Sequence, residues 1–374
     1  MLYLDFAKAF DKVCHKRLLT KLESIGITGK MLSWFRDWLS DRKQRVGIEG
    51  HFSDWIDVIS SVMQGSVLGA ILFNIFIDDI DAGILALIRK FADDTKVAMQ
   101  VNNQEEAERM QRVIDNLCRW AEEWAMAFNK GKCKIMHFGR ENIRHQYQMN
   151  GTSLEEVEEE KDLGVWVQTT MKPSKQCEAA AKKANHVLGM IVRSFHFRRS
   201  AHLVPLYKTF VRPLLEYAVA AWCPWQEQDI QKLEKVQERL VKLLSDKKGA
   251  TYEERLENLG ITTLRTRRKR GDLIEAFKCM KGINRIDKHG WFDIKPEDRV
   301  RSTRATASVS EEGQVNPKAD VLNIGHTRLE IRRNFYTKQI IKDWNALPES
   351  VKEQKSVNAF KSQLDIWLKK NNYK

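Results

Sequence analysis

The sequence lacks the patterns that would indicate a zinc-binding, disulfide-rich or membrane-spanning protein. Its six cysteines stand apart, with no C-x-x-C pair, which argues against a zinc site and fits a reducing compartment. No apolar run reaches the roughly 18 residues that a membrane-spanning helix needs. The opening letters MLYLDF read as a strand, and not as a basic start with a long apolar core. We therefore expect no secretory leader and an intracellular protein, nuclear or cytoplasmic or both.

Internal repeats and low-complexity tracts are also missing. The 374 residues, 43% hydrophobic and 30% charged, suit a globular protein of two or three domains. The net charge of +13 is uneven, because residues 1–168 carry 22 basic and 26 acidic side chains and residues 169–374 carry 41 and 24. This asymmetry suits a metal-dependent core beside a polyanion-binding surface, although solvated helix faces would also explain it.

The hydrophobic periodicity predicts an α+β first part and a helical second part. In the first part we expect strands and hairpins at 2–5, 45–61, 87–99, 132–138 and 147–168, and helices at 18–25, 30–42, 67–80 and 104–128. In the second part we expect helices at 173–195, 202–221, 226–245, 251–258, 262–284, 331–345 and 356–370. Pro213 should kink or break the second of these helices.

The segment LIRKFADDTKVAM places Asp93 and Asp94 side by side between two apolar runs. Turn chemistry is one explanation, since aspartate favours turns by bonding its own backbone. The other explanation is a bound divalent cation, which would remove the repulsion between adjacent carboxylates. Asp5 ends the first strand, so pairing of the hairpin with that strand would bring three carboxylates to one sheet edge. Such a cluster suits two Mg²⁺ ions about 3.5–4 Å apart.

Several segments resemble the palm motifs of reverse transcriptases. Their amino-acid sequences are most similar to those of non-LTR retrotransposons of the Jockey type and their vertebrate relatives. These segments occur in the family's order and are YLDFAKAFDKV, VMQGSVLGAILFNIFIDDI, KFADDTKV, WAMAFNKGKCKIMHFG and KDLGVWV. The second part resembles the region that such elements carry after the palm, in LYKTFVRPLLEYAVAAWCP, LEKVQERLVKLL, YEERLENLGITTLRTRRKRGDLIEAFK and WNALPESV. The likeness covers nearly the whole chain.

The resemblance implies a fold and a set of domains. The fold would be an antiparallel palm sheet with helices on one face, followed by a helical thumb-like and C-terminal region. The domains would be a palm over 1–168, a thumb-like region over 169–284, a linker or mobile loop over 285–330 and C-terminal helices over 331–374. The family carries a fingers region upstream of the first motif, and this sequence begins four residues before Asp5. We therefore expect a palm that is truncated before the fingers.

The resemblance also implies the roles of individual residues. Asp5, Asp93 and Asp94 would hold two Mg²⁺ ions, with Mn²⁺ as a substitute. Lys132, with Lys130 and Lys134 as rivals, would protonate the leaving pyrophosphate or offset its charge.

Further implied roles concern the substrates, which would be an RNA template, a DNA primer and deoxynucleoside triphosphates. Phe10 matches the bulky residue that excludes a ribose 2′-hydroxyl, although a core aromatic would have the same spacing. Gln64 and Gly65 match the turn beside the incoming nucleotide and template, and Leu163 and Gly164 match the primer-gripping hairpin. The chain departs from the family at Ala70, where proline is usual, and at Asp162, where an aromatic residue is usual.

Two basic segments lie in the second part, RSFHFRR over 193–199 and RTRRKR over 265–270. The second segment has five positive charges in six residues, at Arg265, Arg267, Arg268, Lys269 and Arg270. With Tyr207, Trp222 and Trp225 nearby, both segments suit the phosphates and bases of a template–primer. The second segment also suits a nuclear address.

Three functions remain open at this point. The first is an RNA-directed DNA polymerase that uses two metal ions to transfer nucleotides to a primer 3′-hydroxyl. The second is a catalytically inactive remnant of a retrotransposon that retains only nucleic-acid binding. The third is a nucleotide cyclase-like palm, which the basic helical part and the Gln64–Gly65 turn argue against.

Overall fold

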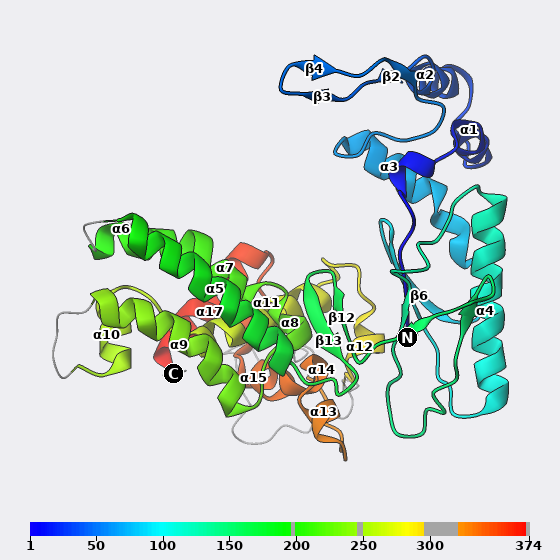
Figure 1. Cartoon of the computed structure of the whole chain (residues 1–374). Coiled ribbons are helices and arrows are strands. Elements are labelled where there is room, and N and C mark those ends of the chain that lie inside the picture. The colour runs from blue at the N-terminus through cyan, green and yellow to red at the C-terminus, as the bar shows by residue number, and fades with distance from the viewer. Residues whose placement is uncertain (196–198, 245–249, 295–320, 372–374) are drawn as a thin grey trace, which may run out of the picture. The chain divides into compact units, whose positions relative to one another are not determined.

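The computed structural model describes residues 1–195, 199–244, 250–294 and 321–371. The chain forms two compact units, Met1–Leu163 and Gly164–Lys374. Figure 1 shows the sheet and α4 in the first unit and the helices of the second. Each unit has its own hydrophobic core, so each is described by itself.

The first unit is built on a five-stranded sheet in the order β11-β8-β1-β7-β6. The central strand β1 pairs antiparallel with β7 on one side and with β8 on the other. Strand β11 adds in parallel to β8, so the expected antiparallel sheet has one parallel edge. The strands are β1 (Leu2–Leu4), β6 (Leu87–Phe91), β7 (Asp94–Ala98), β8 (Lys134–Ile135) and β11 (Glu155–Glu156).

The two faces of this sheet differ because side chains alternate along each strand. Leu2 and Leu4 point into the core together with Val97 and Ile135. The amphipathic helix α4 (Gln104–Glu123) contributes Ile114, Leu117 and other buried residues to the same core, and Figure 1 shows it beside the sheet. The opposite face carries Tyr3 and Asp5, which are the odd-numbered positions of the first strand.

The remaining elements of the first unit form helices above the sheet and short two-stranded ribbons. The helices are α1 (His15–Ser24), α2 (Gly29–Leu39), α3 (Val67–Phe76) and the 3₁₀ turns η1 (Phe10–Lys12) and η2 (Asp78–Asp81). The ribbons pair β2 (Lys43–Gln44) with β5 (Ile56–Asp57), β3 (Gly47–Ile48) with β4 (His51–Phe52), and β9 (Gln148–Met149) with β10 (Thr152–Ser153). Strand β12 (Glu159–Asp162) ends this unit.

The second unit is helical after strand β13 (Val165–Gln168). Its longer helices are α5 (Ser174–Ser194), α9 (Glu227–Leu244), α11 (Leu264–Met280) and α17 (Val357–Lys370). Its shorter helices are α6 (Ser200–Leu206), α7 (Arg212–Glu216), α8 (Val219–Trp222), α10 (Tyr252–Asn258), α12 (Lys288–Trp291), α13 (Glu330–Arg333), α14 (Tyr336–Gln339), α15 (Ile341–Ala346) and α16 (Glu349–Lys352). The helical second part that the sequence predicts is confirmed.

The expected helix at 202–221 is not continuous. A π-helical turn, η3 (Tyr207–Val211), separates α6 from α7, and Pro213 is the second residue of α7. Proline lacks an amide hydrogen and clashes with the carbonyl of the preceding turn, so the wider turn accommodates it. A second break falls at Ala218, whose φ of 50° is in the left-handed region.

The segment 285–330, predicted to be a linker or mobile loop, is described only in part. Its stretch 295–320 lies outside the described residues. On either side, α12 and an isolated bridge between Ile294 and Leu322 give the described parts some regular structure. Among the residues that the structure describes, none of the helices is apolar over a length sufficient to cross a membrane.

Gly69 in α3 permits a close approach that no other residue type allows. A Cβ atom there would overlap the carbonyl oxygen of Met63 and lie 2.8 Å from Ser66 Oγ. We predict that Gly69→Ala lowers the free energy of unfolding by about 1–3 kcal/mol, because the loop before α3 must shift. Urea unfolding measures this loss. Gly131→Ala is the control, since its Cβ would meet only Asn129 Oδ1 at 3.6 Å, and equal losses in both variants would contradict the prediction.

Candidate active site

The end of β1 places Asp5 between residues of two neighbouring strands. The pairing of Leu4 with Thr95, continued by one residue, sets Asp5 opposite Asp94. The pairing of Tyr3 with Lys134, continued in the same way, sets Asp5 opposite Lys132. The backbone after the strand is also held, because the Asn129 amide donates to the Asp5 carbonyl at 2.8 Å. The sequence predicts that the three carboxylates meet at one sheet edge if the hairpin pairs with the first strand. The hairpin does pair with that strand, and it brings Asp5 and Asp94 together.

Asp93 and Asp94 stand at the tight turn between β6 and β7. Phe91 pairs with Asp94, so Ala92 and Asp93 alone make the connection. Ala92 has a φ of 50°, a conformation that costs an L-residue free energy and persists only where its surroundings enforce it. The turn fixes both carboxylates at the end of the hairpin nearest to Asp5.

The carboxylates act on one another electrostatically. Partial desolvation, followed by the negative charges of Asp93, Asp5 and Asp162, raises the pKa of Asp94, and Lys96 opposes this shift. Like charges at close range disfavour the ionised form. The surroundings therefore disfavour the charged state of Asp94.

The fit to a metal ion is partial. Carboxylate oxygens are the ligands that Mg²⁺ prefers. However, no three Asp, Glu, His or Cys side chains in the described part of the chain are arranged to hold a metal ion. Lys132 Nζ instead lies 3.3 Å from Asp5 Oδ2. The donor chemistry and the charge repulsion fit a divalent cation, but a complete ligand shell is not preformed.

Of the three candidate lysines, Lys132 is the one that faces Asp5. Lys130 donates to Asn150 O and Thr152 Oγ1 on the β9–β10 ribbon. Lys134 pairs with Glu155 on β11. The register explains the difference, because only Lys132 lies in the same row of the sheet as Asp5.

A pocket of about 250 Å³ lies over this face of the sheet. Its lining includes the predicted site residues Asp5, Asp94, Lys132 and Leu163. The other lining residues are Tyr3, Leu4, Thr95, Lys96, Gly131, Lys134, Glu160, Lys161 and Asp162. Asp93 does not line it.

Tyr3 and Lys96 belong to the pocket although sequence reasoning gave them no role. They pair with each other across β1 and β7, one row from Asp5 and Asp94. Tyr3 Oη is buried and has no hydrogen-bond partner among the described residues. Strand alternation was the signal that would have found them, since residues two apart share a face.

Phe10 does not line this pocket. It lies in η1, half-buried, and its ring stacks on Phe73 with centroids 4.5 Å apart. This contact is what a core aromatic would make, and the role against a 2′-hydroxyl stays a prediction.

Gln64 and Gly65 form an exposed turn immediately before α3. Gly65 has a φ of 86° and open space where a Cβ would be. Ser66 caps α3 by accepting the Gly69 amide, which holds the end of this turn.

Leu163 and Gly164 form a turn with φ angles of 44° and 86°. Leu163 is 39% exposed and lines the pocket. Gly164 is the first residue of the second unit. Two consecutive left-handed residues fix a tight turn, for which glycine is suited at the second position.

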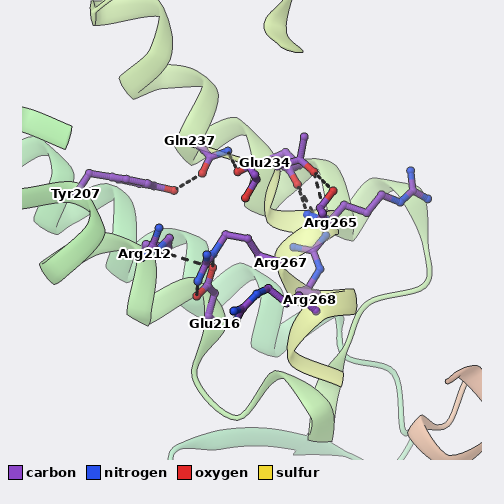
Figure 2. Close-up of polar contacts among 12 residues, drawn as sticks. Tyr207, Arg212, Glu216, Glu234, Gln237, Arg265, Arg267 and Arg268 are labelled. Atoms are coloured by element: carbon purple, nitrogen blue, oxygen red, sulfur yellow. Dashed lines mark hydrogen bonds and ion pairs between the residues drawn. The ribbon is translucent and has the colours of Figure 1, made fainter. Parts of the chain in front are cut away.

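The basic segment 265–270 lies at the start of α11, and its side chains face carboxylates of the second unit. Figure 2 shows the Arg267 side chain against Glu216, and it shows the backbone of Arg265 beside Glu234, which accepts the Arg265 amide hydrogen. Every basic side chain of the segment has a carboxylate within 4.0 Å, in the pairs Arg265–Glu227, Arg267–Glu216, Arg268–Glu234, Lys269–Asp343 and Arg270–Asp365.

This placement differs from the expected polyanion-binding surface. Helical periodicity distributes five adjacent charges around the helix, so some must point inward. Arg268 shares the buried side with Leu264 and is only 3% exposed. Arg265, with its side chain 54% exposed, is the most accessible member of the segment. Nucleic-acid binding by these residues stays a prediction.

The aromatic residues expected to stack on bases are mostly buried. Tyr207 is fully buried and donates to Gln237 Oε1 at 2.8 Å (Figure 2). Trp222 is 5% exposed and donates to Tyr217 O. The expected stacking role of these two residues is therefore wrong, because neither ring is accessible. Of the segment 193–199, residues 196–198 lie outside the described part.

We predict that Arg270→Met destabilises the second unit by about 1–2 kcal/mol, because two hydrogen bonds to Asp365 are lost from a partly buried pair. Arg265→Met is the matched control and should cost less than about 0.5 kcal/mol, since its pair is exposed. Hydrogen exchange in α11 during urea titration measures both. Equal effects would contradict the prediction.

We predict that Asp94→Asn raises the free energy of unfolding at neutral pH, in a buffer that contains a metal chelator. The pKa of Asp94 is raised in the folded state, so as the pH rises Asp94 loses its proton first in the unfolded chain. The free energy of unfolding therefore falls as the pH rises through the range in which this carboxyl group ionises. At low pH, where both states are protonated, the wild type and the variant should differ least. Urea unfolding at acidic and neutral pH measures the difference. A variant that is less stable than the wild type at neutral pH would contradict this account.

Comparisons with known proteins agree with the motif order. Residues 1–192 match the family described as reverse transcriptase (RNA-dependent DNA polymerase). The RNA-directed DNA polymerases from mobile element jockey of Drosophila funebris and Drosophila melanogaster are 27% and 24% identical over 257 residues. A probable RNA-directed DNA polymerase from transposon BS of Drosophila melanogaster is 22% identical over 260 residues.

Each of these matches covers 65% of this chain and 28% of the relative, so the chain spans about a quarter of the length of these relatives. Among solved structures, telomerase from Candida albicans in complex with a fragment of telomeric RNA is 11% identical, with a TM-score of 0.33, covering 72% of this chain and 48% of that chain. The family match extends over more than half of the chain and includes the whole candidate site. The chain therefore belongs to the reverse transcriptase family.

Proposed function

We propose that this chain carries the catalytic palm of an RNA-directed DNA polymerase of a non-LTR retrotransposon. It would transfer nucleotides from deoxynucleoside triphosphates to the 3′-hydroxyl of a DNA primer on an RNA template. The observation that carries the proposal is the register of β1, which sets Asp5 beside Asp94 at the end of the Asp93–Asp94 hairpin.

Asp5, Asp93 and Asp94 would hold the Mg²⁺ ions. A divalent metal bound there supplies Lewis-acid activation of the attacking hydroxyl and stabilises charge on the leaving pyrophosphate. The protein's own contribution is to keep the carboxylates close despite their repulsion, through the β1–β7 pairing and the tight turn at Ala92.

Lys132 would act on the pyrophosphate. It lies 3.3 Å from Asp5, and its side chain is 65% exposed, so it stands beside the carboxylates and also reaches solvent. A positioned ammonium group can give a proton to the leaving oxygen or balance its charge. Lys130 and Lys134 are directed to other partners.

The substrate-facing residues would be Phe10, Gln64 and Gly65. Stacking on Phe73 holds the Phe10 ring in one place, which a residue that excludes a 2′-hydroxyl needs. The open space at Gly65 lets a nucleotide approach the backbone. Leu163 and Gly164 would contact the primer strand, and Leu163 already borders the carboxylate pocket.

The alternative of a remnant that only binds nucleic acid finds less support. Its main surface was the basic segment 265–270, and four of those five side chains are no more than 37% exposed and lie in ion pairs. The geometry of the first unit favours chemistry at the carboxylates over binding at that segment.

We predict that the purified chain extends a DNA primer on an RNA template in Mg²⁺, and that Asp93→Asn lowers the rate by at least about a hundredfold, since charge neutralisation at the reacting centre is a large catalytic term. Asp78→Asn is the matched control, because that side chain is 87% exposed and is not one of the three proposed metal ligands. Extension with labelled primer measures both.

Wild-type extension by Asp93→Asn would overturn the metal assignment. Salt-dependent binding of template–primer by the wild-type chain, without any extension, would support the binding-only alternative instead.

A further inference from the structure

The face of the sheet that carries the carboxylates has a second row of side chains. One row places Asp94, Asp5 and Lys132 side by side, and the next places Lys96, Tyr3 and Lys134 side by side. Both rows line the same pocket. In the second row, Lys96 is bound to a residue that comes from outside the sheet.

That residue is Asp162, the last residue of β12. Lys96 Nζ lies 2.5 Å from Asp162 Oδ2, and the two side chains are only 21% and 20% exposed. By contrast, Lys132 in the first row is 65% exposed. A charge pair that is largely shielded from water is screened less and gives more directional restraint than an exposed pair.

The Lys96–Asp162 pair joins two segments that are far apart in the chain and both belong to the site. Lys96 lies two residues after Asp94 on the same strand and the same face. Asp162 lies immediately before the Leu163–Gly164 turn. The pair therefore connects the strand that carries a proposed metal ligand with the segment that leads into the proposed primer contact.

Charge balance supports the same pairing. Asp162 adds a negative charge to a pocket that already holds Asp5 and Asp94. Lys96 pairs with this acid, and the pairing offsets its repulsion by the other two carboxylates.

We propose that Lys96 and Asp162 are positioning residues, whose ion pair holds the Leu163 side of the turn against the carboxylate pocket and so sets where the primer terminus rests. The proposal rests on the proposed function for its substrate, a nucleic-acid primer strand. Its geometric part, the fixing of the 159–163 segment on β7, concerns the folded chain alone.

The competing role for Lys96 is direct binding of a primer phosphate. The two roles differ in their dependence on Asp162. A phosphate ligand would be needed whether or not Asp162 is charged, whereas a positioning pair loses its function when either partner is removed.

The experiment compares Lys96→Met, Asp162→Asn and the double variant with the wild type, using the complete chain. The matched control for hydrogen exchange is Lys134→Met with Glu155→Gln, because that pair lies in the same row of the sheet and leads to β11, away from the turn. Hydrogen exchange over 159–163 is measured on every variant, and primer extension at varied primer concentration is measured on the wild type and on the Lys96 and Asp162 variants.

In both single variants we expect exchange over 159–163 to be about tenfold faster, since a local contact is lost. We also expect KM for the primer to rise about tenfold with kcat changed less than about threefold, because the change affects placement and not the reacting groups. The double variant should be no worse than either single variant, and the control pair should leave 159–163 unchanged.

Wild-type exchange and wild-type KM in Asp162→Asn would overturn the proposal. Loss of primer affinity in Lys96→Met and in the double variant, with Asp162→Asn at wild-type level, would overturn it in favour of direct phosphate binding. If no variant, including the wild type, extends a primer, the proposed function fails. The exchange data then still decide whether the pair fixes the segment.

Discussion

The candidate site depends on one constraint, the pairing of β1 with β7 on one side and with β8 on the other. This short strand contributes three residues to the ladder, and its register alone sets which side chains stand beside Asp5. A shift by one residue would turn Tyr3 and Asp5 into the core and expose Leu2 and Leu4. Burial of those two leucines against α4 therefore fixes the geometry of the carboxylates on the opposite face.

Charge compensation shapes both units, with different results. In the first unit, each of the lysines 96, 132 and 134 pairs with a carboxylate at or next to the sheet face. A pocket of about 250 Å³ remains over that face. In the second unit, the same chemistry is used to hold helices together. The guanidinium groups of α11 pair with acids of α7, α9 and α17. Part of the positive charge of residues 169–374 is therefore neutralised by ion pairs between helices. A basic composition alone therefore does not indicate which of these side chains would be accessible to a polyanion.

Local signals in the sequence were reliable where a short-range rule applied. The long amphipathic helix was expected to begin at residue 104, and Asn103 caps it there, because its side chain accepts the Glu106 amide. A strand-and-hairpin segment was also expected before residue 168, and Asn150 and Gly151 form a turn with positive φ between β9 and β10. Longer-range features were missed, because nothing local indicates that Tyr207 hydrogen-bonds to Gln237 thirty residues away. The break at 207–218 needed both Pro213 and the packing around it.

The sequence by itself determined the order of the motifs, the carboxylates at strand ends and turns, and the division into an α+β part and a helical part. These follow from residue type and spacing, which act over a few residues. The tertiary structure decided which lysine faces Asp5, that Asp162 pairs with Lys96, and that the arginines of α11 point at acids. Those outcomes depend on strand register and on which side of a helix is buried, and both are set by contacts between residues far apart in the chain.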